Sequence, residues 1–325
     1  MIKRKQKLKN IFKDLPIILK IVNWSKQYSP PGFSGVTLHD TITFVMHEIQ
    51  KDNLQTRANA ISFSFFISIF PAIIFLFTLL PLFPVVQDYT LTLRTQSEGL
   101  LPKNAHEYIF SIIDDITSIH REGLLSLGAV LALFFSSNGM LTLMSGFDKA
   151  YQDAFKPRHW INSRLIAISL TIVMSLLLIL SLVIIVVEGF FMDYLQTNFD
   201  IPDVFILLFT IINWLISILL IYTGISLIYK YGPSMYRRFP YINVGSVVAT
   251  LLSLITSFGF SFFINNFGRY NEIYGSIGAL IVMLIWIQFN SFILLVGFEL
   301  NASISVHHIR QKKDKILKLN QKQEL

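Results

Sequence analysis

Six stretches of roughly 20 apolar residues, free of Asp, Glu, Lys, Arg and His, constrain this chain more than any other feature of its sequence. They lie at about 60–84, 123–147, 165–187, 204–228, 241–265 and 274–298. An apolar helix of about 20 residues crosses the hydrocarbon core of a bilayer. Hydrophobic residues make up 53% of the chain and charged residues 14%, against about 25% charged in soluble domains. The sequence therefore predicts an all-α, polytopic membrane protein with six transmembrane helices.

Basic residues are concentrated on one side of this predicted bundle. Of the 27 Lys and Arg residues, 23 lie before the first span, after the last span, or in the second and fourth loops. Segments that remain in the cytoplasm carry such an excess of Lys and Arg. The third loop, from Glu188 to Asp203, contains four acids and no base. We therefore expect both termini in the cytoplasm, and we assign the net charge of +7 to the inner membrane face rather than to a nucleic-acid groove.

The sequence divides into three parts. We predict cytoplasmic or interfacial amphipathic helices over 1–58, the six-helix membrane domain over 59–303, and a basic cytoplasmic tail over 304–325. Apolar residues between Leu8 and Val22 share one helical face. That helix lies either on the anionic inner leaflet or against the cytoplasmic end of the bundle. In the external segment 85–122, isoleucines at helical spacing predict an external amphipathic helix.

Small residues recur at spacings that bring helices close together. A small side chain lets the backbone of a neighbouring helix approach, and a four-residue spacing keeps such side chains on roughly one side of a helix. The predicted packing residues of the second, fifth and sixth spans are Gly128, Gly245, Ala249, Ser253, Ser257, Gly275 and Gly278. The third span is almost purely Leu, Ile and Val. We therefore expect spans one, two, five and six inside the bundle and span three against lipid.

Polar side chains in the first and sixth spans allow two interpretations. The residues concerned are Asn59, Ser62, Ser64, Ser68, Gln288 and Asn290. These side chains either pack against neighbouring helices or line a path through the bundle. The first span also contains Pro71, which frees the carbonyl of Ile67 and predicts a kink.

Charged residues gather at the predicted inner ends of the spans. The candidate contacts for anionic headgroups are Arg57, Lys149, Arg158 and Arg164. They act either as ordinary topology signals that pair with lipid, or as a basic vestibule that gathers phosphate-bearing amphiphiles, to which the planar fork of Arg is suited. Glu299 is a lone acid among them, and we predict that it pairs with one of the Arg or Lys residues.

The residues offer little for catalysis or metal binding. The sequence has no Cys, no glycine-rich phosphate loop and no recognisable Ser-His-Asp set. Four potential ligands share the second predicted cytoplasmic helix: His39, Asp40, His47 and Glu48. A zinc helix places its His residues at i and i+4, so a solvated helix face is favoured over a metal site. We expect no catalytic residue, metal or cofactor, and no coupling through an acid within the spans.

Four sequence blocks carry a resemblance to a known family. They are RANAISFSFFISIFPAIIF at 57–75, FDKAYQDAFKPRHWINSRL at 147–165, YKYGPS at 229–234 and YGSIGALIVMLIWIQFNSFILLVGFELNA at 274–302. In this order and spacing, residues 55–303 resemble the YihY/virulence factor BrkB family of bacterial inner-membrane proteins. Two departures are mild: Asp148 stands where the family pattern has Asn, and Ser62 where Ala is usual.

The resemblance implies a multi-pass protein of the bacterial cytoplasmic membrane, with a link to serum resistance and a ribonuclease label for tRNA processing. A metal-dependent nuclease needs clustered His and Asp ligands, and no predicted cytoplasmic segment supplies them convincingly, which disfavours the label. The leading hypothesis is therefore a transporter of a lipid, a lipid-linked precursor or another anionic amphiphile. A non-catalytic scaffold for envelope functions is the alternative, and a ribonuclease is a distant third. The expected partners are anionic headgroups at the cytoplasmic face, with no nucleic acid, and self-association is left open.

Overall fold

The computed structural model describes residues 16–30, 35–51, 54–79, 122–148, 155–199, 202–266 and 269–323. These residues are mainly helical, with one isolated bridge between Phe155 and Met235 outside the helices. The helices are α2 (Pro16–Gln27), α3 (Leu38–Lys51), α4 (Leu54–Leu79), α7 (Glu122–Phe147), α8 (Trp160–Asn198), α9 (Asp203–Tyr231), α10 (Val244–Asn266) and α11 (Arg269–Gln323).

Six of these helices are long and apolar enough to cross a membrane, which confirms the predicted all-α, polytopic fold. Their apolar segments are Leu54–Leu76, Gly128–Phe147, Trp160–Met192, Val204–Tyr231, Val244–Ile264 and Leu280–Val306. Each overlaps one predicted span. The predicted external helix within 85–122 and most of the predicted first amphipathic face lie outside the described residues. The cytoplasmic location of the termini stays a prediction.

The helices run past the points where the predicted apolar stretches end, so the candidate spans take in charged residues beyond those stretches. The segments that are apolar enough to cross the membrane include Arg57, Arg164, Glu188, Lys230 and Glu299. A helix continues for as long as its backbone hydrogen bonds are made, and a charged side chain near a membrane surface does not interrupt them. The expectation of no coupling through an intramembrane acid stays a prediction.

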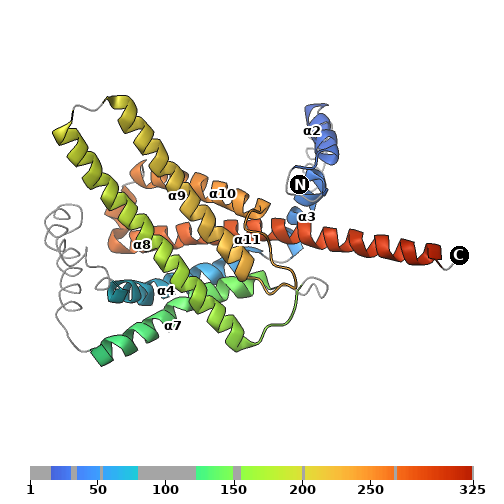
Figure 1. The fold of residues 1–325 in the computed structure, drawn as a ribbon, viewed down its shortest axis with the longest axis horizontal. Coiled ribbons are helices and arrows are strands. Elements are labelled where there is room, and N and C mark those ends of the chain that lie inside the picture. Colours follow the sequence, from blue (N-terminus) through green and yellow to red (C-terminus); the bar gives the residue numbers. More distant parts are fainter. Residues whose placement is uncertain are drawn as a thin grey trace.

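The last helix runs across the predicted boundary at residue 303, and the division into domains stays a prediction. α11 continues without a break from Arg269 to Gln323, so the described part of the predicted tail, 304–323, extends the sixth span as one helix. In Figure 1 this helix projects well beyond the other spans.

The six spans are arranged as a ring. α4 packs against α7 and α11, α8 lies between α7 and α9, and α10 lies between α9 and α11. α3 packs on α11 and α4, and α2 packs on α3 (Figure 1). We call the end at which α4, α8 and α10 begin and α7 and α9 finish the loop end. It carries the connections 148–159 and 232–243.

The core shared by all six spans lies at the loop end. α4 contributes Ile61, α7 Leu143, α8 Ala167, α9 Tyr229, α10 Ala249 and α11 Leu295. At its centre is an aromatic cluster of Phe147, Tyr229 and Phe298. The rings of Phe147 and Phe298 stack with centroids 4.6 Å apart, and Tyr229 meets Phe147 edge-on at 5.8 Å. The Tyr229 hydroxyl donates to the Leu294 carbonyl at 2.7 Å, which joins α9 to α11.

Two glycines let α10 and α11 touch through their backbones. A Cβ on Gly245 would collide with the Gly297 carbonyl oxygen. A Cβ on Gly297 would collide with the Tyr229 hydroxyl, and it would lie 2.9 Å from the Cβ of Ala249. These contacts bring α9, α10 and α11 together at one point.

The other predicted packing residues do not all lie in helix contacts. A Cβ on Gly128 would meet no described atom within 4 Å, whereas Gly139 and Gly146 of the same helix would meet Phe65 and Ile61 of α4. Ser253 and Ser257 are half-buried and Gly278 is buried. The surroundings of Gly275 lie outside the described residues.

Away from the loop end, the bundle opens. Among the described side chains, none is buried in α8 beyond Leu170, in α9 before Gly224, or in α10 beyond Thr250. In α4, α7 and α11 buried residues continue further away from the loop end, for example Phe75 in α4 and Ala132 in α7. Figure 1 shows the α8–α9 hairpin diverging from α4, α7 and α11. Within the described residues, the ring is therefore closed at the loop end and splayed at the opposite end.

Gly245→Ala should destabilise the protein, because the new methyl group would be forced against the Gly297 carbonyl oxygen. Overpacking of this kind costs about 1–3 kcal/mol. Gly259→Ala, in the same helix, is the matched control: its Cβ would meet no described atom within 4 Å, and Ala is favoured over Gly inside a helix by about 0.5–1 kcal/mol. Thermal unfolding of the purified protein in detergent measures both changes. An equal effect of the two substitutions would contradict the α10–α11 contact.

Candidate functional site at the loop end

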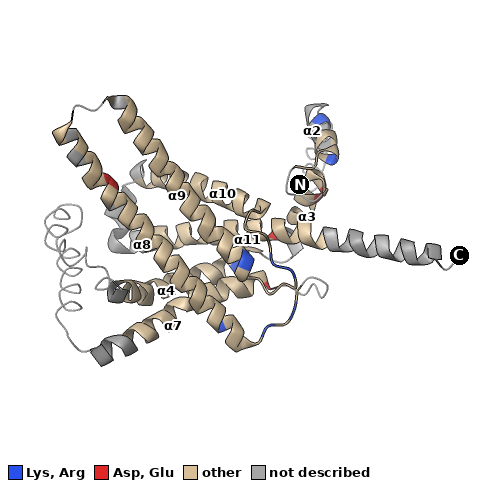
Figure 2. Cartoon of the chain, viewed as in Figure 1, with Lys and Arg blue, Asp and Glu red and all other residues tan. Residues whose placement is uncertain are grey.

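The two connections at the loop end dock against each other. Phe155 and Met235 form an isolated antiparallel bridge. The Lys156 amide donates to the Ser234 carbonyl at 2.9 Å, and the Ser234 hydroxyl donates back to the Lys156 carbonyl at 2.6 Å. The segment before α8 is thereby fixed to the segment after α9. Figure 2 shows basic residues of the described chain in these two connections and in the adjoining helix ends.

Arg158 strengthens this junction. Its two terminal nitrogens donate to the carbonyls of Gly232 and Pro233, at 3.0 and 2.9 Å. These carbonyls follow the last residue of α9, where a helix leaves acceptors without partners and its dipole is negative. Partial burial lowers the pKa of Arg158, the nearby Asp148 carboxylate opposes that shift, and Arg238 adds to it.

Asp148 belongs to the same cluster of charges. Burial among these loops raises the pKa of its carboxyl group, although Arg158 and a hydrogen bond with the Ser234 backbone act in the opposite direction. Arg57, from α4, reaches the carbonyl of Gly146 in the last turn of α7 at 3.5 Å. Two of the predicted headgroup contacts, Arg57 and Arg158, thus donate to carbonyls at helix C-termini. The third, Lys149, lies outside the described residues.

Arg164 differs from the others, because its partners lie well inside a span. Its Nη1 donates to Asn138 Oδ1 at 2.8 Å and to Ser137 Oγ at 3.1 Å, and its guanidinium carbon lies 4.1 Å from the centroid of the Phe134 ring. Ser137 is ten residues before Phe147, the last residue of α7, or about 15 Å along the helix axis. We call Arg164, Ser137 and Asn138 the intramembrane polar cluster.

Asn138 and Ser137 are the residues that the sequence interpretation missed. They lie in the run Ser136-Ser137-Asn138-Gly139, the only polar run inside the second predicted span, which was the available signal. An ionisable residue of a spanning helix that has fixed polar partners is a candidate functional residue, because placing a charge within a span costs free energy.

Two of the candidate path residues meet across the α4–α11 contact. Asn59 Oδ1 accepts from Gln288 Nε2 at 2.7 Å and from Gln55 Nε2 at 3.2 Å, and the Asn59 side chain is exposed. Asn290 instead donates to the Trp286 carbonyl of its own helix at 2.9 Å.

The serines of α4 face other surroundings. Ser62 is buried and its hydroxyl donates to the Asn59 carbonyl at 3.3 Å. Ser68 is buried and accepts from the Gly139 amide of α7 at 2.9 Å. Ser64 is half-buried. The structure therefore places Ser62 and Ser68 in helix contacts, whereas Asn59 is the exposed member of the set.

The run Gly297-Phe298-Glu299-Leu300-Asn301-Ala302 joins α11 to the start of α10. Asn301 Oδ1 accepts from the Gly245 amide at 2.8 Å, and Asn301 Nδ2 donates to Asn243 Oδ1 at 2.6 Å. Asn243 Oδ1 also accepts from the Ser246 amide at 2.8 Å. The two Asn side chains thus satisfy the first free amides of α10. Glu299, two residues before Asn301, is fully buried. Its ion pair with a basic residue stays a prediction.

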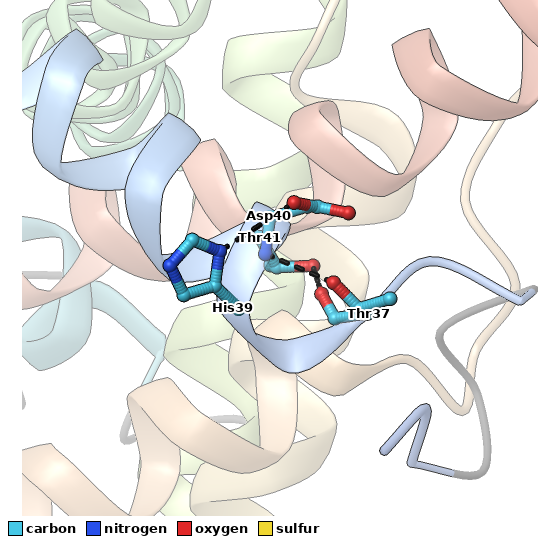
Figure 3. Close-up of polar contacts among 4 residues, drawn as sticks. All are labelled: Thr37, His39, Asp40 and Thr41. Atoms are coloured by element: carbon cyan, nitrogen blue, oxygen red, sulfur yellow. Dashed lines mark hydrogen bonds and ion pairs between the residues drawn. The ribbon is translucent and has the colours of Figure 1, made fainter. Parts of the chain in front are cut away.

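Two of the four candidate metal ligands, His39 and Asp40, lie at the start of α3 (Figure 3). Thr37 Oγ1 accepts from the Asp40 amide at 3.1 Å, and the Thr41 hydroxyl donates to the Thr37 carbonyl at 3.0 Å. His39 Nδ1 lies 3.6 Å from Asp40 Oδ1. The side chains of His47 and Glu48 lie outside the described set, within which no three His, Asp or Glu residues are grouped as a metal site would need.

These features define a multi-pass membrane protein with a closed, polar loop end. The profile of the Virulence factor BrkB family matches residues 45–322, and the chain belongs to that family. It is 31% identical over 281 residues to a Bacillus subtilis protein named ribonuclease-like protein YfkH, covering 86% of this chain and 94% of that one.

Other relatives are named only as membrane proteins. A UPF0761 membrane protein of Mannheimia succiniciproducens is 25% identical in a match that covers 78% of this chain and 85% of the Mannheimia protein. A UPF0761 membrane protein of Psychromonas ingrahamii is 24% identical, covering 84% and 90%. No solved structure matches this chain. The family relationship thus supports a multi-pass protein of a bacterial membrane.

Arg158→Gln should loosen the loop end, because it removes both guanidinium donors from the carbonyls after α9. Hydrogen bonds from a charged group contribute about 1.5–3 kcal/mol, and Arg158→Lys should recover only part of this, since Lys lacks the planar fork. The matched control is Lys156→Gln, whose side chain is exposed in the same connection. Thermal unfolding should show Arg158→Gln below Arg158→Lys, and Lys156→Gln near wild type. Equal unfolding temperatures for wild type and the three variants would show that the hydrogen bonds of Arg158 do not stabilise the loop end.

Proposed function

We propose that this protein moves a lipid, or another anionic amphiphile, across the bacterial cytoplasmic membrane, with the loop end facing the cytoplasm. The observation that carries the proposal is the intramembrane polar cluster. A guanidinium held by Asn138 and Ser137 inside the α7–α8 contact presents a positive charge at membrane depth. An anionic headgroup moving along these helices gains there a partner that hydrocarbon does not offer.

The splayed shape of the bundle supports a lateral route. The outer parts of α8 and α9 expose apolar side chains, including Leu178, Leu182, Phe205 and Leu208. Acyl chains can cover such surfaces, so an amphiphile can keep its tails in the bilayer while its headgroup follows the polar groups of the protein. A water-soluble solute has no comparable use for exposed apolar helices.

The hydrogen-bonded pair Asn59 and Gln288 supplies a second polar position near the surface of the spans. Two amide side chains, those of Gln288 and Gln55, donate to the Asn59 Oδ1. The remaining N–H donors of these amide side chains suit the phosphate and glycerol oxygens of a lipid, which accept hydrogen bonds.

A scaffold role is the second candidate, and the burial of Ser62 and Ser68 favours it. Both side chains are used within or between helices, so part of the polarity of α4 is explained by packing alone. We further propose that the protein is not an enzyme; the ribonuclease-like name belongs to the relative YfkH, and RNA cleavage by the purified protein would contradict this.

The direct test is lipid movement in vesicles containing the purified protein. Headgroup-labelled phosphatidylglycerol and phosphatidylcholine are followed in parallel, in wild type and in Arg164→Gln. We expect wild type to move the anionic lipid faster than protein-free vesicles do, and Arg164→Gln to slow it by about tenfold, the effect of losing about 1.4 kcal/mol of charge-assisted contact. Arg164→Lys should retain part of the activity.

Lys156→Gln is the control here too, since it removes one positive charge from the loop end and leaves the intramembrane polar cluster intact. Circular dichroism and unfolding temperature verify that each variant is folded. Folded wild-type protein that moves no lipid would refute the proposal, and equal rates in wild type and Arg164→Gln would refute the role of Arg164.

Gln288→Leu and Ser253→Leu separate transport from scaffolding. If the pair of Asn59 and Gln288 serves lipid movement, Gln288→Leu should slow it severalfold while leaving the unfolding temperature close to that of wild type. Ser253 is half-buried in α10, so Ser253→Leu should change the unfolding temperature instead. A Gln288→Leu protein with unchanged lipid movement would assign this pair to packing.

A further inference from the structure

A second group of cations, separate from the intramembrane polar cluster, lies where α9 ends and α10 begins. Lys230 Nζ lies 3.1 Å from the centroid of the Tyr241 ring, and the Arg238 guanidinium lies 5.0 Å from that of Tyr231. The hydroxyls of Tyr231 and Tyr241 are 3.0 Å apart and hydrogen-bonded. Each of two cations therefore lies over a tyrosine ring, and the hydroxyl groups of the two rings are hydrogen-bonded to each other. We call these four residues the cation–tyrosine patch.

The patch is held in place by α9. The hydroxyls of Tyr222 and Ser226 both donate to the Tyr241 carbonyl, the first at 3.0 Å. Asn243, two residues further on, donates to the Pro240 carbonyl at 2.9 Å. The Tyr241 ring is thus presented on a backbone fixed to a transmembrane helix, and a ligand that binds it need not order a loose loop.

The patch is strongly positive. Arg237 and Arg238 are both exposed, and Arg238 is close enough to Arg158 to lower the pKa of that residue. The hydrogen bond with Tyr231 and the neighbouring Lys230 lower the pKa of the Tyr241 hydroxyl. The hydrogen bond, which belongs to the tyrosine pair itself, is the largest cause of this shift in pKa, whereas Lys230 and Arg238 add the effect of positive charge, which favours an anion at this place.

Exposed apolar side chains adjoin the patch. Ile242 is 82% exposed and Tyr236 is 67% exposed, although both lie in the short connection between two membrane-spanning helices. Burying an exposed Ile side chain in an apolar phase is favourable by roughly 1.5–3 kcal/mol, and Tyr is favoured at the membrane interface. The connection therefore fits the boundary between headgroups and acyl chains.

We propose that the cation–tyrosine patch binds the phosphate of an anionic phospholipid, with Ile242 and Tyr236 against its acyl and glycerol region. Lys230 offers a point charge and Arg238 a planar fork, the two ways in which side chains bind phosphate. A free phosphate ion would use the same donors, but it would leave Ile242 in water. This site is distinct from Arg164 and does not depend on lipid movement, because it is defined by binding alone.

The experiment is lipid retention by the full chain in mild detergent, measured by native mass spectrometry. Phosphatidylglycerol, phosphatidylcholine and inorganic phosphate are titrated separately. Wild type should retain phosphatidylglycerol in preference to phosphatidylcholine. The double variant Lys230→Gln/Arg238→Gln should lose about tenfold or more of that affinity, since each basic side chain near anionic lipid contributes about a factor of five.

The matched control is Lys20→Gln/Lys26→Gln, which removes the same charge from exposed positions of α2. It should retain phosphatidylglycerol within about twofold of wild type. An equal loss in the two double variants would overturn the proposal, because it would show a response to net charge only. Equal retention of the two lipids by wild type would overturn it as well.

Two single variants keep the proposal testable if the double variant does not fold. Ile242→Ser changes an exposed side chain, and it should weaken phosphatidylglycerol retention without altering the weak binding of inorganic phosphate. Tyr241→Phe keeps the ring under Lys230 and should retain more lipid than Tyr241→Leu. Inorganic phosphate that competes with the lipid at equal concentration would identify a site for a soluble anion and overturn the lipid assignment.

Discussion

The contact of Phe147, Tyr229 and Phe298 at the loop end is the interaction on which the rest of the structure depends. Lipid tails are as apolar as Leu, so burial from water does not drive transmembrane helices together, and close packing has to do so. The glycines beside this cluster let α10 touch α11 through the backbone, and the Tyr229 hydroxyl reaches a carbonyl of α11. Every span contributes a buried side chain to this one region.

The polar residues of the loop end follow from that closure. Where helices end together in a closed region, their terminal amides and carbonyls need partners. Arg158 supplies donors after α9, and Asn301 and Asn243 supply acceptors before α10. The sequence interpretation counted Arg158 among the candidate headgroup contacts, whereas its guanidinium donors are used by carbonyls after α9. The exposed Arg238 is the residue at this end for which we propose contact with an anion.

Composition was enough to predict six spans, because hydrocarbon excludes most other structures. The spacing of small residues correctly placed Gly245 and Ala249 in a helix contact, but it did not predict every face that meets. Gly128 and Gly139 look alike in sequence, yet only Gly139 lies against another helix among the described residues. The pairs of Arg164 with Asn138 and of Gln288 with Asn59 join different spans, so they depend on the rotation of each helix. The predicted third span began at Leu165 and excluded Arg164, because an apolar stretch is bounded by charged residues. The helix itself begins at Trp160.

The position of the closed region also limits how this protein can change shape. Opening a pore along the axis would break the aromatic cluster and the α10–α11 backbone contact, each among the most buried features of the chain. Moving the outer parts of α8 and α9 breaks no comparable contact, since their described side chains there are not buried. Interfaces rearrange where few packed contacts have to be lost. Among the described residues, motion of the outer parts of α8 and α9 therefore breaks fewer packed contacts than motion at the loop end.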